Sequence, residues 1–235
     1  MLRANAVQKY SLKVIIPANL IIKNQKQTNS CWAFATLSSL ETNLALYNYK
    51  NGVNTSKVYD FSERHMEYAT SKTFANNVEN KKGYNRTVGS GGSYQLSESY
   101  LTNGTGAIPE SEMPFENNEN TIDISQIQNK TVSSQVYDTI LFPNYSKADD
   151  DEKTNIMNQI KQHIQNYGSV QASVHGNSSS STFNCYNNKT GAKYCNTTVM
   201  HQIDHAVSVI GWDDNYSVDN FPEKAKPTAN GAWIV

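Results

Sequence analysis

One stretch of this chain, from Asn24 to Phe34, carries residue types suited to nucleophilic chemistry, and Cys31 lies within it. Two small polar residues that precede Cys31 are able to cap a helix. After it, apolar residues recur at helical spacing, at Phe34, Leu37, Leu40, Leu44 and Tyr47. A thiol in the first turn of a helix faces the positive end of the helix dipole and unpaired N–H groups, which favour the thiolate. The alternative is that Cys31 is a small residue buried beneath the helix, because free cysteines are often buried.

A cysteine nucleophile needs a base, and the chain has five histidines. His65 and His163 lie in helical patterns with polar neighbours and need no function. His175 and His201 lie in polar segments that are expected to face solvent, and they need no function either. His205 differs, because it opens an apolar run that predicts a buried strand. A strand would fix the backbone of His205 while its ring extends from the sheet edge. His205 is therefore the best candidate for the base that activates Cys31.

The composition leaves room for one large domain or two modest lobes, at 235 residues. Hydrophobic residues make up 37% of the chain, and the mean hydropathy of −0.62 is low because Asn, Ser and Thr are abundant. A net charge of −1 gives no electrostatic reason to expect binding to nucleic acid or to an anionic membrane. No apolar run approaches the roughly 18 residues of a membrane span.

The two ends of the chain bear on its origin. The first residues lack the apolar core of a signal peptide. The last residues, 231–235, form an apolar run that is typical of the start of a buried strand. Because domains seldom end inside a strand, we expect the chain to be a piece of a longer precursor.

The cysteine count is odd, at three. Cys185 and Cys195 flank a polar segment with a turn signal at 189–191. A disulfide between them would stabilise a surface hairpin by roughly 2–3 kcal/mol, and it would leave Cys31 as the free thiol of an exported protein. The alternative is that all three cysteines are reduced in a cytosolic protein.

Sequence patterns in the first half of the chain predict short helices separated by loops. Residues 12–22 form an apolar run broken by proline, which indicates extended structure. The helix that starts at Cys31 is expected to end near the Asn51-Gly52 pair. Residues 61–69 contain a serine cap and an acidic first turn, which predict a second helix. Residues 75–93 read as a loop, and 97–101 as the centre of a third helix.

The second half has a different pattern. Alternating apolar residues predict a strand over 131–142, with Val132, Val136, Ile140 and Phe142 as candidates for burial. The acidic run 149–152 precedes isoleucines spaced four apart. We interpret this run as the complement of a helix N-terminus rather than as a calcium site. Three further strands are expected, over 170–174, 205–212 and 232–235.

These patterns divide the chain into two lobes. Residues 1–125 form a helical lobe that carries the nucleophile, and 126–235 form a mainly β lobe that carries the histidine. The boundary is expected within 117–130, and the extreme N-terminus is free to pair with the β lobe.

Several motifs resemble those of the papain-like cysteine peptidases, family C1. Asn24-Gln25 followed by Ser30-Cys31-Trp32-Ala33-Phe34 is similar to the active-site signature of the family, and Asp204-His205-Ala206-Val207 followed by Gly211-Trp212 is similar to its histidine segment. Three smaller landmarks follow in the family's order, at Ser62-Glu63, Gly89-Ser90-Gly91-Gly92 and Pro114-Phe115. The resemblance covers roughly 20–235 and is closest in style to bacterial and archaeal members.

The resemblance implies an α+β, papain-like two-lobe fold, with a helical left lobe, a β-barrel-like right lobe and the active-site cleft between them. Cys31 would be the thiolate nucleophile that forms a thioester with the substrate. His205 would be the acid and base, and Gln25 would donate to the oxyanion together with the Cys31 N–H. The resemblance implies no cofactor and no metal.

The resemblance also implies a polypeptide substrate bound in extended conformation. Gly91 and Gly92 would lie along the cleft, where absent side chains let the substrate backbone approach. The other substrate-binding candidates are Ser93, Tyr94, Ser173, Ile203, Asp204 and Ala206.

Three departures from the family pattern stand out. Thr28 replaces a cysteine that many members carry three residues before the nucleophile, so that disulfide is missing. The asparagine that orients the histidine would lie beyond Val235, so the chain by itself is expected to have low activity. An inhibitory propeptide would lie outside this chain. A secreted or cell-surface location is expected for the parent protein.

Three functions remain open. The leading one is a cysteine endopeptidase, and the second is a Cys-His acyl transferase that uses the same residues. The third is a catalytically impaired papain-like module for binding or adhesion. The retention of Cys31, His205 and Gln25 together argues against the third.

Overall fold

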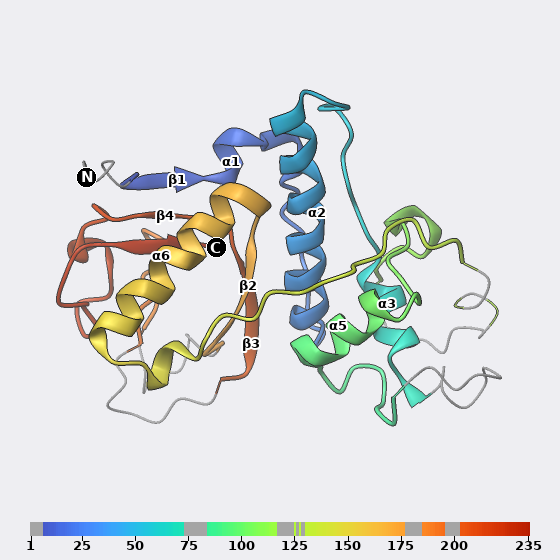
Figure 1. The fold of residues 1–235 in the computed structure, drawn as a ribbon. Helices are drawn as coiled ribbons and strands as arrows, with labels where there is room; N and C mark the ends of the chain where they lie inside the picture. The colour runs from blue at the N-terminus through green and yellow to red at the C-terminus, as the bar shows by residue number, and fades with distance from the viewer. Residues whose placement is uncertain are drawn as a thin grey trace.

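The computed structural model describes residues 7–72, 84–116, 125, 127, 130–176, 185–195 and 203–235. A long central helix, α2 (Cys31–Asn51), separates two groups of elements (Figure 1). Helices α3 (Glu63–Ala69) and α5 (Tyr94–Thr102) lie on one side of it, and the strands lie on the other side with α6 (Asp150–Tyr167). The two-lobed α+β fold expected from the sequence is therefore present.

Helix α2 contributes to both cores of the molecule. Trp32 and Leu37, near its N-terminus, belong to the cluster of the helical lobe, whereas Ala45 and Leu46 belong to the cluster of the β lobe. The helix ends where the sequence predicts, because Gly52 takes a left-handed conformation with φ of 63°. One helix therefore ties the two lobes together, and its first residue is Cys31.

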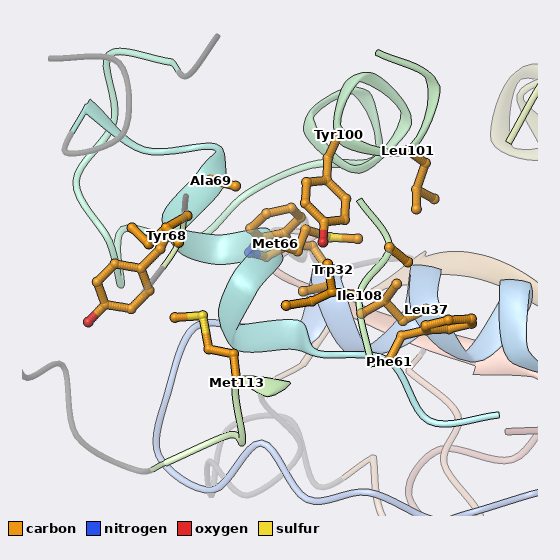
Figure 2. Close-up of a cluster of buried hydrophobic side chains, with 13 residues drawn as sticks. Trp32, Leu37, Phe61, Met66, Tyr68, Ala69, Tyr100, Leu101, Ile108 and Met113 are labelled. Carbon is orange, nitrogen blue, oxygen red and sulfur yellow. The ribbon is translucent and has the colours of Figure 1, made fainter. Parts of the chain in front are cut away.

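The core of the helical lobe is built around α3 and α5. The Ser62 side chain accepts the His65 N–H and caps α3, as its sequence predicts. Figure 2 shows Met66 of α3, Tyr100 of α5 and Trp32 of α2 gathered in this cluster. Helix α3 therefore packs directly against the first turn of α2.

His65 lies at the centre of this core and is 1% exposed. Its Nε2 is 3.2 Å from the Ile127 carbonyl, which can only accept, so Nε2 carries the proton. Nδ1 then accepts from the Tyr100 hydroxyl at 2.7 Å. Burial of the ring lowers the pKa of His65 from 6.5 to about 4, although the Ile127 carbonyl partly opposes this shift.

The depressed pKa of His65 predicts an acid-sensitive core. Above pH 6.5 the imidazole is neutral in both the folded and the unfolded chain. As the pH falls toward 4 the unfolded chain binds the proton first, so folding loses roughly 3 kcal/mol over this interval. Unfolding by urea at several pH values should show the advantage of wild type over His65→Gln shrinking by that amount. A constant difference between pH 7 and pH 4 would contradict this account.

The described residues of the β lobe form two small antiparallel sheets. Strands β1 (Lys9–Ser11), β4 (Gly211–Asp213) and β5 (Ala232–Ile234) form one sheet in the order β1-β4-β5. Strands β2 (Val170–Val174) and β3 (His205–Val209) form the other. The N-terminal segment thus pairs with the β lobe through β1. The division of the chain near residue 125 stays a prediction, since 117–124 lie outside the described residues.

Helix α6 covers the strands and begins at a capping box. Asp149 Oδ1 accepts the Glu152 N–H at 2.9 Å, and Glu152 Oε2 accepts the Asp149 N–H at 3.2 Å. The acidic run therefore starts a helix, as interpreted from the sequence. Ile156 and Ile164 of α6 are buried. No helix in the described part of the chain has the length and apolar character needed to span a membrane.

The predicted strand over 131–142 is wrong. The segment has no regular structure, and Ile140 is 59% exposed. Its backbone hydrogen bonds are scattered and do not follow one partner strand. The Ser133 N–H donates to Ala107 O, and the Val136 N–H donates to Leu101 O. Exposure does alternate along 131–136, but the neighbours are a turn and a helix end rather than a strand edge.

Two other sequence predictions need correction. Residues 12–22 are not extended, because α1 (Leu12–Ile15) and a 3₁₀ turn, η1 (Pro17–Asn19), lie there. The predicted strand 205–212 is two strands that separate at Ile210, whose N–H donates to β5 instead. The shorter 3₁₀ elements are η2 (Glu110–Glu112), η4 (Tyr145–Lys147) and η5 (Val218–Asn220). Of the predicted loop 75–93, only 84–93 is described, and it is irregular.

Candidate active site

Cys31 is a free, half-exposed cysteine at the first position of α2. Ser30 before it is fully buried, but its hydroxyl donates to Thr28 Oγ1 at 2.8 Å instead of capping the helix. The Cys31 N–H donates to none of the described residues. The first N–H groups of a helix lack intrahelical partners, so this N–H is available to a ligand beside the thiol.

Gln25 lies in a tight turn before the helix. Its Nε2 donates to Thr28 O at 2.6 Å, and the Thr28 N–H donates back to Gln25 O at 3.3 Å. A primary amide carries two N–H donors. The turn therefore fixes the half-buried side chain of Gln25 with one N–H, and no described residue takes the other.

His205 is the first residue of β3 and pairs with Val174 of β2. The neighbouring Asp204 accepts the Gly176 N–H at 2.6 Å through Oδ1. A Cβ at residue 176 would lie 2.8 Å from His205 Cβ, which real Cβ contacts essentially never reach. Glycine at 176 is therefore required for the chain to pack this closely against His205.

Side-chain contacts fix how α2 lies along the β2–β3 pair. In the middle of the helix, Thr42 Oγ1 accepts the Ser169 N–H at 2.9 Å. Nearer the N-terminus, the Thr36 hydroxyl donates to Gln171 Oε1 at 2.5 Å. The N-terminal end of α2 therefore lies toward the C-terminal end of β2.

The same register relates Cys31 to His205. Cys31 precedes Thr36 by five residues, which is about 7.5 Å along a helix and about two residues along a strand. Cys31 is therefore level with Ser173, whose partner in β3 is Ala206. Because His205 directly precedes Ala206, α2 and β3 begin at the same end of their interface.

A cation that the sequence patterns do not reveal, Lys193, acts on His205. Burial lowers the pKa of His205, the charge of Lys193 lowers it further, and Asp204 partly opposes both. Lys193 Nζ donates to the carbonyls of His175 and Gly176, and burial lowers the pKa of this ammonium as well. The lysine therefore disfavours the imidazolium form of the candidate base.

A disulfide holds Lys193 in its position. Cys185 and Cys195 are bonded, with 4.9 Å between their Cα atoms, and they close the hairpin that carries the lysine. An isolated β-bridge pairs Tyr186 with Lys193 inside this hairpin. In the sequence, the two cysteines around a polar turn predict the hairpin, but they do not indicate that Lys193 acts on His205.

Removal of the lysine charge should therefore raise the pKa of His205. We expect Lys193→Met to shift the His205 titration to higher pH, because a nearby positive charge no longer opposes protonation. Histidine NMR titration measures this shift directly. Lys189→Met, in the same hairpin, serves as the control. An unchanged or lower pKa of His205 in Lys193→Met would contradict the assignment.

The glycine segment lies against the start of α2. A Cβ at Gly92 would lie 2.3 Å from Cε2 of Trp32, so only glycine fits there. Gly91 has φ of 77°, which also favours glycine. The Asn29 side chain donates to Gly89 O at 2.8 Å. The structure thus brings Gly91 and Gly92 beside the residues that flank Cys31.

The other substrate-binding candidates are divided between the lobes. Ser93 and Tyr94 begin α5, and the Tyr94 side chain is 43% exposed. Ser173 and Ala206 are cross-strand partners in β2 and β3. Ile203 lies just before β3 and is 66% exposed.

One histidine prediction is wrong. The His175 side chain, expected to face solvent, is only 12% exposed, and its Nδ1 lies 3.9 Å from Asp204 Oδ1. Lys193 donates to the His175 carbonyl and Asp204 accepts the Gly176 N–H, contacts that the polar sequence neighbours of His175 do not reveal. His201 lies outside the described residues.

Comparison with solved structures finds similar proteins. The cysteine protease and lectin-like domains of Cwp84, a surface layer associated protein of Clostridium difficile, match with a TM-score of 0.72 and 27% identity, covering 98% of this chain and 44% of that one. Clostridial Cwp84 after propeptide cleavage matches with a TM-score of 0.71 and 28% identity, covering 96% and 48%. The chain therefore spans less than half the length of these two proteins. No curated protein sequence matches it.

More distant matches agree on the fold. Bromelain from Ananas comosus, in complex with the E64 inhibitor, has a TM-score of 0.57 and 16% identity, covering 97% of this chain and 89% of that one. The profile of the papain family cysteine proteases matches residues 18–225. This range includes α2, β3 and the segments that flank Cys31 and His205. The chain belongs to the papain family of cysteine proteases.

Proposed function

We propose that the protein is a cysteine-type endopeptidase in which Cys31 is the nucleophile and His205 is the general acid and base. The observation that supports this assignment best is the common starting point of α2 and β3, with Cys31 and His205 as their first residues. Membership in the papain family supports the same reaction class.

The proposed reaction proceeds in two steps. The Cys31 thiolate attacks the carbonyl carbon of the scissile bond, and the imidazolium of His205 gives its proton to the leaving amine. The thioester that remains is then hydrolysed by a water molecule whose proton His205 accepts. Both tetrahedral intermediates carry an oxyanion, to which the Cys31 N–H and the second N–H of Gln25 would donate.

The substrate would be a polypeptide in extended conformation. Gly91 and Gly92 present backbone without side chains beside Cys31, which suits pairing with another extended chain. Ser173 and Ala206 line the opposite strand pair at the same level. The proposed substrate therefore passes between the glycine segment and the start of β3.

We further propose a secreted or cell-surface location and control by a propeptide outside this chain. The Cys185–Cys195 disulfide supports an oxidising compartment. Cwp84, to which this chain is similar, is a surface layer associated protein and a cysteine protease whose propeptide is cleaved.

Labelling with the epoxide E64 tests the proposal in the protein as the cell makes it. We expect covalent addition of one inhibitor molecule at Cys31, detected by peptide mass, together with hydrolysis of denatured casein. Cys31→Ala should lose both. An absence of labelling, or labelling that survives Cys31→Ala, would exclude this function. Product analysis with an added amine separates hydrolysis from acyl transfer.

A further inference from the structure

We propose that Arg86 is a positioning residue that holds the Gly91–Gly92 edge against Trp32, and so aligns the substrate backbone beside Cys31. This inference rests on the proposed function and assigns it a residue outside the papain-like motifs. Arg86 lies in the irregular segment after residue 84, where the sequence shows no periodic pattern.

The guanidinium of Arg86 joins two parts of the helical lobe. Its Nε and Nη2 both donate to Gly91 O, at 3.0 and 2.8 Å. Its Nη1 donates to Glu67 O at 2.8 Å and to Thr70 Oγ1 at 3.2 Å, at the C-terminal end of α3. The negative end of a helix dipole favours a cation there. The glycine edge is thereby anchored to a helix that is wholly buried.

The same side chain also contacts the residue next to the nucleophile. Arg86 Cζ lies 5.2 Å from the centroid of the Trp32 ring, within the range of a cation–π interaction. Gly92 packs on that ring so closely that a Cβ would overlap it. Trp32 is 1% exposed and follows Cys31. Arg86, Gly92 and Trp32 therefore form a continuous set of contacts that ends beside the thiol.

No disulfide ties the glycine segment to the segment around Cys31. It has three cysteines, and two of them, Cys185 and Cys195, are bonded to each other. Among the described residues, the Asn29 side chain also donates to Gly89 O, which ties the glycine segment to the segment before Cys31. Arg86 thus ties the edge in place without a covalent bond, through two hydrogen bonds to Gly91 O.

An arginine suits this position better than a lysine. Its planar fork makes two bonds to one carbonyl and two more on the opposite side, which an ammonium cannot do with the same geometry. Burial lowers the pKa of Arg86, but an arginine stays charged under all working conditions. The contact therefore persists across the pH range of the reaction.

Loss of Arg86 should weaken substrate binding more than it weakens the nucleophile. The Gly91 carbonyl would be free to turn, whereas Cys31 and His205 keep their own elements. We expect Arg86→Met to lower kcat/KM on casein by about 10- to 100-fold, the loss that removal of a charge-assisted hydrogen bond produces, mainly through KM. Arg86→Lys should be intermediate.

The test compares Arg86→Met and Arg86→Lys with Arg64→Met. Arg64 is the matched control, because its guanidinium lies in the same lobe and contacts Pro114 O and Glu116 rather than Gly91. Three rates are measured: casein hydrolysis, inactivation by E64, and alkylation of Cys31 by iodoacetamide, which needs no glycine edge. The inference predicts that the first two fall in the Arg86 variants while alkylation stays within about twofold of wild type.

Binding separates this inference from the proposed function. Fluorescein-labelled casein is titrated onto the Cys31→Ala protein with and without Arg86→Met, so no catalysis is needed. A roughly tenfold weaker Kd in the double variant supports the inference even where wild type does not cleave casein. An unchanged KM in both Arg86 variants, together with an unchanged Kd in the double variant, would overturn it. So would a parallel fall in iodoacetamide alkylation, since this would mean a general disturbance of the lobe.

Discussion

His205→Ala is expected to lower kcat for peptide hydrolysis by about 10²- to 10⁴-fold, the usual contribution of a general acid and base. The leaving amine would lack a proton donor, and the attacking thiol would lose its partner. Substrate binding should change little, because the strand pair continues through Ala206 and Ser173. Steady-state kinetics with a fluorogenic peptide measure kcat and KM separately.

His163→Ala is the control for this experiment. His163 lies on α6 against Phe142 and Tyr167, away from β3, and burial lowers its pKa as it does that of His205. Its removal should leave kcat unchanged. Equal losses in the two variants, or wild-type kcat in His205→Ala, would contradict the role of His205.

Gln25→Ala is expected to lower kcat by about 10²- to 10³-fold while KM stays close to wild type. The reason is that an oxyanion donor acts on the transition state more than on the bound substrate, and removal of one donor costs about 2.7–4 kcal/mol. The Cys31 N–H would remain as the single donor. The same steady-state assay measures the effect.

Two comparisons make this prediction specific. The Gln25 side chain also ties the turn through Thr28 O, so its loss affects local structure as well. Alkylation of Cys31 by iodoacetamide reports on that effect and should stay near the wild-type rate. Gln27→Ala, an exposed residue of the same turn, should retain full activity. A higher KM with an unchanged kcat would contradict the oxyanion role.

Residue types alone indicated much of this site. A cysteine at the start of an amphipathic pattern and a histidine at the start of an apolar run predict where a helix and a strand begin, and both elements begin there in the structure. Short-range signals such as the Ser62 cap and the acidic run 149–152 also gave correct helix starts. These features depend on neighbours within a few residues, which a sequence contains.

Features that depend on distant neighbours were missed. Arg86 and Lys193 lie in irregular segments, and their roles come from carbonyls that other loops present to them. Residues 131–142 have the alternation of a strand but no strand edge beside them. The run 205–212 divides at Ile210, because β2 pairs only as far as Val209 and the Ile210 N–H donates to Ile234 of the other sheet. Periodicity predicts a side chain's exposure, whereas it does not identify the partner.

The most direct test of the central account is the pH dependence of Cys31 alkylation in wild type and in His205→Ala. Iodoacetamide reacts with thiolates, and an ordinary cysteine is mostly protonated well below pH 8.5. If Cys31 and His205 act as one unit, the histidine should make wild type react faster than His205→Ala wherever an ordinary thiol is protonated. His205→Ala should then react much more slowly at pH 6 and nearly as fast as wild type at pH 9. Identical pH profiles for the two proteins would contradict the account.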